Sequence, residues 1–322
     1  MILIVGAGPM AQEYYKVVKD LDGLENEEVV IIGRNESSAQ EFYKNTGKKV
    51  VTGGVNQYIL ENKCALSIKE AIVAVGVEAL YETTVALIHY GVKKILVEKP
   101  AGLVLNEIKL LSELASKSGC SVYVAYNRRF FSSVLKAREL IEQDGGLESF
   151  VFEVTEWASV IEKIKKADGV KENWFFANSS HIVDLAFFLG GKPNEIASYV
   201  SGHTTWHSRS ANFVGAGKTI NDVLFSYHGN WNSPGRWSLE FSTVKSKYIF
   251  RPIEKLQIQK INSINSEFVE VDDSLDIKYK PGLYLQVKSF LSDNATNLCC
   301  INEHYNNSII YSEMAGYSNK KV

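Results

Sequence analysis

The chain opens with a short apolar run that passes directly into a glycine-rich turn and then into a helical pattern. Ile2-Leu-Ile-Val5 is followed by Gly6-Ala-Gly-Pro-Met-Ala11, and an amphipathic pattern continues over residues 12–19. In this GxGxxA spacing the first glycine permits a sharp turn, the second lets a pyrophosphate approach the backbone, and the small Ala11 lets helix and strand pack closely. Amides at the helix N-terminus then face the phosphates. We therefore predict that a dinucleotide contacts Gly6, Ala7, Gly8, Pro9 and Met10, the alternative being a glycine turn that binds nothing.

The end of the second predicted strand bears on the choice of dinucleotide. This strand covers residues 28–32 and is followed by Gly33-Arg34-Asn35, where an NAD-binding chain would carry Asp or Glu. Without that carboxylate a 2′-phosphate is not repelled, and the Arg34 guanidinium can pair with it bidentately. We therefore expect NADP, with NAD as the alternative, held near Gly33, Arg34, Asn35 and Ser38.

The first part of the chain continues to alternate strand and helix patterns. Strands are predicted over residues 71–75, 94–97 and 121–125, with helices over 78–90 and 105–117. Such alternation is typical of an α/β fold with a doubly wound parallel sheet, the Rossmann arrangement. We predict that this domain covers residues 1–122.

After a helix predicted over residues 132–143, alternation with period two replaces the helical period. Apolar residues alternate with polar ones over 148–157, 195–206, 218–228, 237–241, 247–250 and 256–261, and turn residues separate these runs. They predict an open, mostly antiparallel sheet. Helices are predicted over 181–189, with Ser180 as N-cap, and over 283–291. Because 322 residues exceed one ordinary core, we assign residues 123–322 to a second α/β domain.

Composition limits the classes of partner. The 35 Lys and Arg residues nearly balance 37 Asp and Glu residues, which gives no general attraction to nucleic acid or to an anionic membrane. The four cysteines, Cys64, Cys120, Cys299 and Cys300, lack CxxC spacing and favour a reducing cytoplasm. The N-terminal apolar run is too short for a signal peptide or membrane span. His203 and His207 lack an evident third ligand, so no metal site is predicted.

Lys99 is the first candidate for chemistry. It follows the apolar strand at residues 95–97 and Glu98, and it precedes Pro100, which denies the strand its next N–H. Ligand crevices of open α/β sheets lie outside the carboxyl ends of the strands. Lys99 is therefore a site candidate, with a solvated lysine at a strand exit as the alternative.

Five motifs, taken in order, resemble those of one enzyme family. They are Gly6-Ala-Gly-Pro-Met-Ala11, Glu98-Lys-Pro100, Asn127-Arg-Arg-Phe130, Gly146-Leu-Glu-Ser-Phe150 and His181-Ile-Val-Asp-Leu185. The chain resembles the Gfo/Idh/MocA family of nicotinamide-dependent oxidoreductases. The resemblance implies a Rossmann domain, a second domain whose open sheet often supports oligomerisation, and a sugar or polyol in the cleft between them.

The resemblance also implies hydride transfer between nicotinamide C4 and a carbinol or carbonyl carbon. Lys99 can hydrogen-bond the substrate oxygen, and desolvation in a cleft would lower its pKa. His181 is the second candidate for proton transfer, because the first turn of a helix disfavours an imidazolium. Asp184, on the same helix face, is predicted to orient Lys99 or His181, the alternative being a surface carboxylate. Glu98 is a supporting residue.

Further contacts follow from the same resemblance. The cofactor is expected to contact also Val75, Gly76, Glu98, Lys99 and Asn127, and the substrate to contact Tyr126, Arg128, Trp174 and Asn178. The Lys99–Pro100 bond is cis in many relatives. The chain departs from the family where Ala177 replaces an aspartate found four residues before the histidine in many relatives.

These observations predict an oxidoreductase, most simply one that uses NADPH to reduce a ketosugar, free or nucleotide-linked, in carbohydrate biosynthesis. We expect a homo-oligomer, a dimer or tetramer. Two alternatives stay open: a regulator that binds NAD(P) without catalysis, which the loss of the aspartate at Ala177 would allow, and a dehydrogenase of a non-sugar diol.

Overall fold

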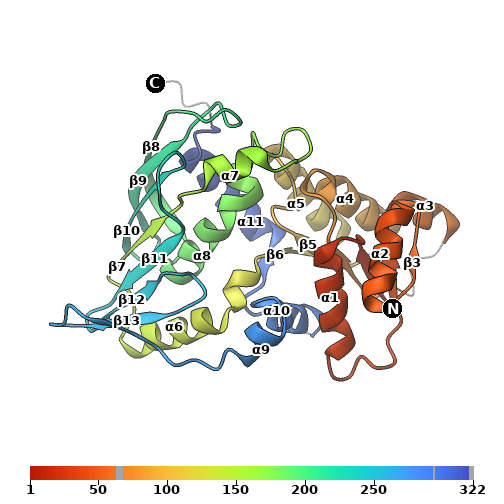
Figure 1. The fold of residues 1–322 in the computed structure, drawn as a ribbon, viewed down its shortest axis with the longest axis horizontal. Coiled ribbons are helices and arrows are strands. Elements are labelled where there is room, and N and C mark those ends of the chain that lie inside the picture. The colour runs from red at the N-terminus through yellow and green to blue at the C-terminus, as the bar shows by residue number, and fades with distance from the viewer. Residues whose placement is uncertain (63–67, 293, 319–322) are drawn as a thin grey trace. The chain divides into compact units, whose positions relative to one another are not determined.

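The computed structural model describes residues 1–62, 68–292 and 294–318, so that Cys64 lies outside the described residues (Figure 1). The chain forms two compact units, and each unit is made of two separate segments of the chain. Unit 1 contains residues 1–127 and 276–305, and unit 2 contains residues 128–275 and those from 306 onward. The predicted division near residue 122 did not include the return of residues 276–305 to the first unit.

Unit 1 is built on a seven-stranded sheet with the order β15-β6-β5-β4-β1-β2-β3. Its strands are β1 (Ile2–Val5), β2 (Val29–Ile32), β3 (Val50–Val51), β4 (Glu70–Val73), β5 (Lys94–Glu98), β6 (Ser121–Ala125) and β15 (Cys299–Cys300). All neighbours are parallel except β15 and β6. The predicted Rossmann sheet is confirmed. Because the strand order reverses between β1 and β4, a ligand crevice is expected at their carboxyl ends.

The central strands of this sheet are apolar along most of their length, as is typical of strands buried on both faces. Leu3, Ile4, Ile72, Ile95 and Leu96 are fully buried. The helices of unit 1 are α1 (Pro9–Asp20), α2 (Glu36–Thr46), α3 (Gly54–Glu61), η1 (Val77–Ala79), α4 (Leu80–Tyr90), α5 (Leu105–Ser118), α10 (Leu283–Leu291) and most of α9 (Ser274–Lys278), which begins in unit 2. Helix α1 begins at Pro9 instead of residue 12, because proline lacks only an N–H that the first turn leaves unused.

Unit 2 is built on an eight-stranded sheet with the order β14-β13-β12-β11-β7-β10-β9-β8. Its strands are β7 (Ser149–Glu153), β8 (Pro193–Ser201), β9 (Asn212–Thr219), β10 (Leu224–Asn230), β11 (Ser238–Ser242), β12 (Ser246–Phe250), β13 (Gln257–Lys260) and β14 (Ser266–Phe268). Among the described strands of this sheet, only β7 and β10 are parallel neighbours. The predicted antiparallel character is therefore confirmed.

One predicted strand, over residues 218–228, is wrong because a turn interrupts it. The chain ends β9 at Thr219 and begins β10 at Leu224, and the two strands form a hairpin. The Thr219 hydroxyl accepts hydrogen bonds from the backbone N–H of Asn221 and of Val223. These bonds and the left-handed conformation of Asp222, whose φ is 59°, fix the turn.

Helix α8 (Ser180–Gly190) lies against the strand β7 of this sheet. A Cβ at Gly190 would lie 2.4 Å from the Phe150 ring, so glycine permits the close approach of helix and strand. The remaining helices of unit 2 are η2 (Asn127–Phe130), which begins in unit 1, α6 (Ser132–Gln143), α7 (Ala158–Lys163) and a π-helical turn (Phe175–Ser179). Helix α11 (Ile301–Met314) contributes residues to both units.

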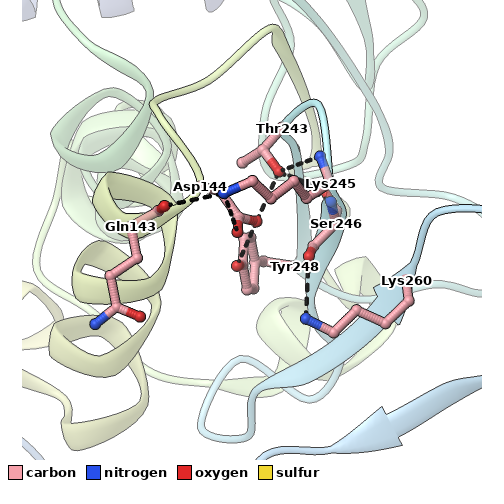
Figure 2. A network of polar contacts seen from close by, with 7 residues as sticks. All are labelled: Gln143, Asp144, Thr243, Lys245, Ser246, Tyr248 and Lys260. Atoms are coloured by element: carbon pink, nitrogen blue, oxygen red, sulfur yellow. Dashed lines mark hydrogen bonds and ion pairs between the residues drawn. The ribbon is translucent and has the colours of Figure 1, made fainter.

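A polar network joins the C-terminus of α6 to the turn between β11 and β12 (Figure 2). The Asp144 carboxylate accepts hydrogen bonds of 2.8 Å from the hydroxyls of both Thr243 and Tyr248. The Lys245 ammonium donates to the Gln143 carbonyl oxygen at 3.2 Å. The network therefore attaches the C-terminal end of α6 to the β11–β12 turn of the sheet.

Within the described residues, none of the helices has both the length and the apolar composition needed to cross a bilayer.

Candidate functional site

A pocket of about 650 Å³ lies in unit 1 at the carboxyl ends of β1 and β4. This is the position that the reversal of strand order predicts. Three groups of predicted residues line it: those of the glycine loop, those beyond β2 that are expected to hold the 2′-phosphate on the ribose (the ribose end), and those that follow β4. They are Gly6, Ala7, Gly8, Pro9, Met10, Gly33, Arg34, Asn35, Ser38, Val75 and Gly76. Glu98, Lys99 and Asn127, also predicted to contact the cofactor, do not line this pocket.

The two loop glycines have different structural roles. Gly6 has φ of 128°, and a Cβ there would lie 2.2 Å from the Ala74 carbonyl oxygen, so only glycine fits. A Cβ at Gly8 would meet nothing within 4 Å, which leaves the approach to this backbone open to a ligand. The first turn of α1 has no side-chain cap, so its N–H groups remain available to an anion. The loop therefore fits the pyrophosphate of a dinucleotide.

Arg34 is the cation at the ribose end of this pocket. Its side chain is exposed, and in the described part of the chain no carboxylate lies within ion-pair distance of it. Asn35 caps α2, and its side-chain oxygen accepts hydrogen bonds from the Ser38 amide at 3.1 Å and the Ser38 hydroxyl at 2.6 Å. Asn35 and Ser38 thus bond to each other, and the Arg34 guanidinium is left as the strongest anion-binding group there.

Sequence reasoning missed the segment that follows β3. Gly53, Gly54, Val55 and Asn56 line the same pocket, as do Glu78, Ala79 and Thr83. The Gly53-Gly54 pair is a turn signal that the sequence offers at this place. In the structure both residues adopt a positive φ directly after the short strand β3. The rule that ligands lie beyond strand ends applies to β3 as well.

Lys99 lies in a tight turn beyond β5. The turn is closed by a hydrogen bond of 3.0 Å from the Ala101 amide to the Glu98 carbonyl oxygen, and its Lys99–Pro100 bond is cis. The Tyr14 hydroxyl of α1 donates to the Glu98 carboxylate at 2.7 Å. Burial, and next the Glu98 charge, raise the pKa of Tyr14 well above its ordinary value, so Tyr14 stays a hydrogen-bond donor.

His304 holds the other side of this turn. Its Nε2 lies 2.9 Å from the Pro100 carbonyl oxygen, and because a carbonyl only accepts, Nε2 carries the proton. The Tyr126 hydroxyl lies 3.4 Å from Nδ1. Tyr126, predicted to contact substrate, is thus placed inside unit 1 beside His304. Nothing in the sequence distinguishes His304 from an ordinary helix residue.

The environment of His181 in unit 2 differs from the prediction. Ser180 does not cap the helix, because the preceding π-helical turn already has helical backbone and the Ser180 hydroxyl donates to the Phe176 carbonyl oxygen at 2.7 Å. The argument from a free helix N-terminus at His181 is therefore wrong. A π-turn is itself rare and often marks a functional site.

Asp184 and Arg129 form a buried bidentate pair. Arg129 Nε donates to one carboxylate oxygen at 2.8 Å and its NH2 group donates to the other at 2.6 Å. Asp184 and Arg129 are only 2% and 3% exposed. The alternative that Asp184 is a surface carboxylate is wrong.

Glu156 is a buried carboxylate that sequence reasoning missed. It accepts hydrogen bonds from Asn178 at 2.8 Å, Ser179 at 2.7 Å and Arg236 at 3.0 Å. Burial raises the pKa of Glu156, and these hydrogen bonds oppose the rise. The amide of Asn178, predicted to contact substrate, is therefore bonded to Glu156. The sequence signal was that Glu156 follows the apolar residues 150, 152 and 154 at the same spacing of two, although the intervening Glu153 and Thr155 are buried as well.

Aromatic rings lie beside the other predicted residues of unit 2. The centre of the Arg128 guanidinium is 5.0 Å from the Trp237 ring, and the His181 and Trp237 rings are 6.4 Å apart. Trp174, predicted to contact substrate, packs edge to face on Trp206.

The family model described as "Oxidoreductase family, NAD-binding Rossmann fold" matches residues 1–126. This is the model of the Gfo/Idh/MocA family, and it covers the part of the chain that forms the Rossmann sheet. The match covers the glycine loop, the Glu98-Lys-Pro100 turn and the pocket, so the resemblance is confirmed for these two motifs.

Solved structures extend the likeness in fold to the whole chain. A levoglucosan dehydrogenase in complex with NADH and levoglucosan is 16% identical, with a TM-score of 0.77 over 100% of this chain and 97% of that one. An NAD-binding oxidoreductase from Klebsiella pneumoniae is 11% identical, with a TM-score of 0.77 over the same shares. The UDP-N-acetylglucosamine 3-dehydrogenase of Acidithiobacillus ferrooxidans is 12% identical, with a TM-score of 0.72 over 97% and 95%. No curated protein sequence matches this chain.

Proposed function

We propose that this protein uses NADPH to reduce a keto group of a sugar, free or nucleotide-linked. The observation that carries the proposal is the pocket at the ends of β1 and β4, with its open glycine loop and an exposed Arg34 at the ribose end. The sugar dehydrogenases among proteins of like fold support a sugar substrate.

In this proposal the chain's residues bind, orient and exchange protons. A bound nicotinamide supplies the hydride. The glycine loop holds the pyrophosphate, and Arg34 pairs with the 2′-phosphate. Lys99 donates a hydrogen bond to the carbonyl oxygen and then its proton, and His181 is the second group for proton transfer. Tyr14 and His304 fix the two sides of the turn that carries Lys99.

The cofactor preference is tested by Arg34→Gln. Removing a charge-assisted pair costs about 1.5–3 kcal/mol, so KM for NADPH should rise about 10- to 100-fold while KM for NADH stays nearly unchanged. Steady-state kinetics with both cofactors measures this. A wild-type protein that prefers NADH would contradict the NADP assignment.

The role of Lys99 is tested by Lys99→Met. Loss of a general acid lowers turnover about 10²- to 10⁴-fold, while NADPH affinity measured by fluorescence should be retained. Lys93→Met is the matched control, because Lys93 is an exposed lysine that donates to the Ser118 carbonyl oxygen and lies outside the pocket. Near-normal turnover of Lys99→Met would remove Lys99 from the mechanism. Binding of NADPH without its consumption by any keto compound would favour the regulator.

We also propose a homo-oligomer formed through the open face of the unit 2 sheet. Tyr199 and Val214, paired across β8 and β9, are 70% and 52% exposed. Neighbouring apolar side chains exposed on one sheet face are typical of a protein interface. Light scattering of wild type and of Tyr199→Glu tests this, and a monomeric wild type would contradict it. The cytoplasmic location stays a prediction.

A further inference from the structure

Unit 2 contains a separate cavity of about 320 Å³ that the proposed chemistry leaves unused. Arg128, Arg236, Trp237 and the segment of residues 251–254 line it. Its three arginines come from distant parts of the chain: Arg128 precedes α6, Arg236 precedes β11, and Arg251 follows β12. The fold therefore brings three guanidinium groups to one cavity.

The charge of this arginine pocket favours an anion. Glu254 is the one acidic residue among those that line it. Arg236 donates one bond to the buried Glu156, and a guanidinium has further donors. Arg251 is exposed, and no carboxylate of the described residues lies within ion-pair distance of it. Arg236 is thus held in place, and Arg251 is open to solvent.

Trp237 holds two of these cations. The guanidinium centres of Arg236 and Arg128 lie 4.5 Å and 5.0 Å from the Trp237 ring. Cation–π contacts of this kind fix the planar groups before a ligand arrives. The Trp237 side chain is buried, and its ring lies 6.4 Å from that of His181. Trp237 is therefore a shared neighbour of the arginine pocket and of His181, the second group proposed for proton transfer.

We infer that the arginine pocket binds the phosphoryl group of a phosphorylated sugar, which assigns the substrate class of the proposed reduction. The identity of the ligand as a substrate rests on the proposed function, whereas anion binding does not. Guanidinium forks match phosphate oxygens bidentately, and a phosphate monoester carries more negative charge than a carboxylate, which suits several arginines better. A sugar monophosphate and a nucleotide-linked sugar share this phosphoryl group.

The first arm of the test measures pyrophosphate binding by calorimetry. Gly8→Val serves as the background, because a Cβ at Gly8 meets no atom within 4 Å and a side chain there should occupy the approach to the cofactor loop. Pyrophosphate should still bind this variant, and adding Arg251→Gln should weaken binding about 10- to 100-fold. Adding Arg209→Gln, an exposed arginine of unit 2 outside the pocket, should change affinity less than twofold. Loss of binding in Gly8→Val alone would overturn the inference.

The second arm measures NADPH oxidation with one ketose in four forms: free, as its monophosphate, linked to a nucleoside diphosphate, and as a uronate. The phosphorylated forms should exceed the free ketose in kcat/KM, and Arg251→Gln should reduce that advantage at least tenfold. A preference for the monophosphate or for the nucleotide-linked form identifies the source of the phosphoryl group. A preference for the uronate, or equal rates with and without phosphate, overturns the inference.

The two arms distinguish a failure of the phosphate site from a failure of the proposed reduction. If pyrophosphate binds at the arginine pocket and no keto compound consumes NADPH, the anion site is supported and the proposed reduction fails. If free and phosphorylated ketoses consume NADPH equally and pyrophosphate does not bind, the reduction stands and the phosphate site is overturned.

Discussion

Asp184 and Glu156 are buried carboxylates of unit 2 whose partners differ. Asp184 receives two hydrogen bonds from the single guanidinium of Arg129, and Glu156 receives three, two from the adjacent Asn178 and Ser179 and one from Arg236. Removing one partner of a buried ion pair leaves the other charge without compensation, whereas exchanging both partners for apolar groups does not. The two sites therefore respond differently to substitution.

For the Asp184 pair we predict a large loss of stability from a single substitution. Asp184→Leu should lower the free energy of unfolding by about 3–5 kcal/mol, because the Arg129 charge stays buried. The double variant Asp184→Leu/Arg129→Met should be more stable than this single variant. Urea unfolding followed by tryptophan fluorescence measures both, and a cost below about 1 kcal/mol for Asp184→Leu would contradict the prediction.

For Glu156 we predict a dependence on pH. Because its pKa is raised in the folded state, its contribution to stability is fully present below the ordinary value of 4.5 and is lost as pH rises through the folded-state value. The difference in unfolding free energy between wild type and Glu156→Gln should therefore fall as pH rises from 4.5 and then level off. Urea unfolding from pH 4.5 to 8 measures this, and a difference that grows with pH would overturn it.

The position of such residues was only partly predictable from the sequence. Glu156 continues an alternation that starts at Phe150, so its burial could be inferred, but its partners Ser179 and Arg236 lie far along the chain. His304 gives no local signal, because its role depends on the fold bringing α11 beside Pro100. The local sequence pattern therefore indicates whether a residue is buried or exposed, whereas its hydrogen-bond partners depend on the tertiary fold.

At the scale of elements, the segments predicted best were those with strong local signals. The predictions for β1, β6, α6 and α10 coincide with the observed bounds. Helix α11 was missed because Asn306-Asn307-Ser308 at its centre lowers helix propensity. Asn307 and Ser308 are buried there, so packing stabilises a helix that the local sequence disfavours.

The network at the end of α6 gives a prediction at this scale. Although burial opposes ionisation, hydrogen bonds from Tyr248 and Thr243 hold the pKa of Asp144 below its ordinary value (Figure 2). The stability it contributes is present above the ordinary value of 3.8 and is lost as pH falls through the folded-state value. Asp144→Ala should therefore cost about 1–3 kcal/mol at pH 7 and less at pH 3.

Urea unfolding at the two pH values measures the Asp144 prediction. Tyr248→Phe is a control that removes one of the two hydroxyl donors and should show a smaller cost at pH 7. A cost for Asp144→Ala that is equal at pH 7 and pH 3 would show that the carboxylate charge does not stabilise this junction.

At the scale of the whole molecule, the chain enters unit 1 twice. It leaves after Asn127, returns at Asp276 and leaves again within α11. The sequence pattern changes only once, near residue 122, which explains the single boundary that was predicted. The return could not be predicted because β15 is only two residues long and because α10 shows only an ordinary apolar face.

Unfolding of the two units should be coupled through α11. Ile301 and His304 are buried in the part of this helix assigned to unit 1, and Tyr311 and Met314 in the part assigned to unit 2. Unfolding of either unit alone would therefore deprive one half of the helix of its packing. Because a helix of this length depends on tertiary packing, the other half would be weakened as well.

This coupling can be measured because the two units carry different signals. All five tryptophans, Trp157, Trp174, Trp206, Trp231 and Trp237, lie in unit 2, whereas the cofactor pocket lies in unit 1. NADPH at 100 times its Kd should stabilise the folded protein by about 2.7 kcal/mol. We predict that the urea midpoints from tryptophan fluorescence and from far-UV circular dichroism rise together. Gly8→Val should abolish both shifts, and a shift in circular dichroism alone would mean that the units unfold independently.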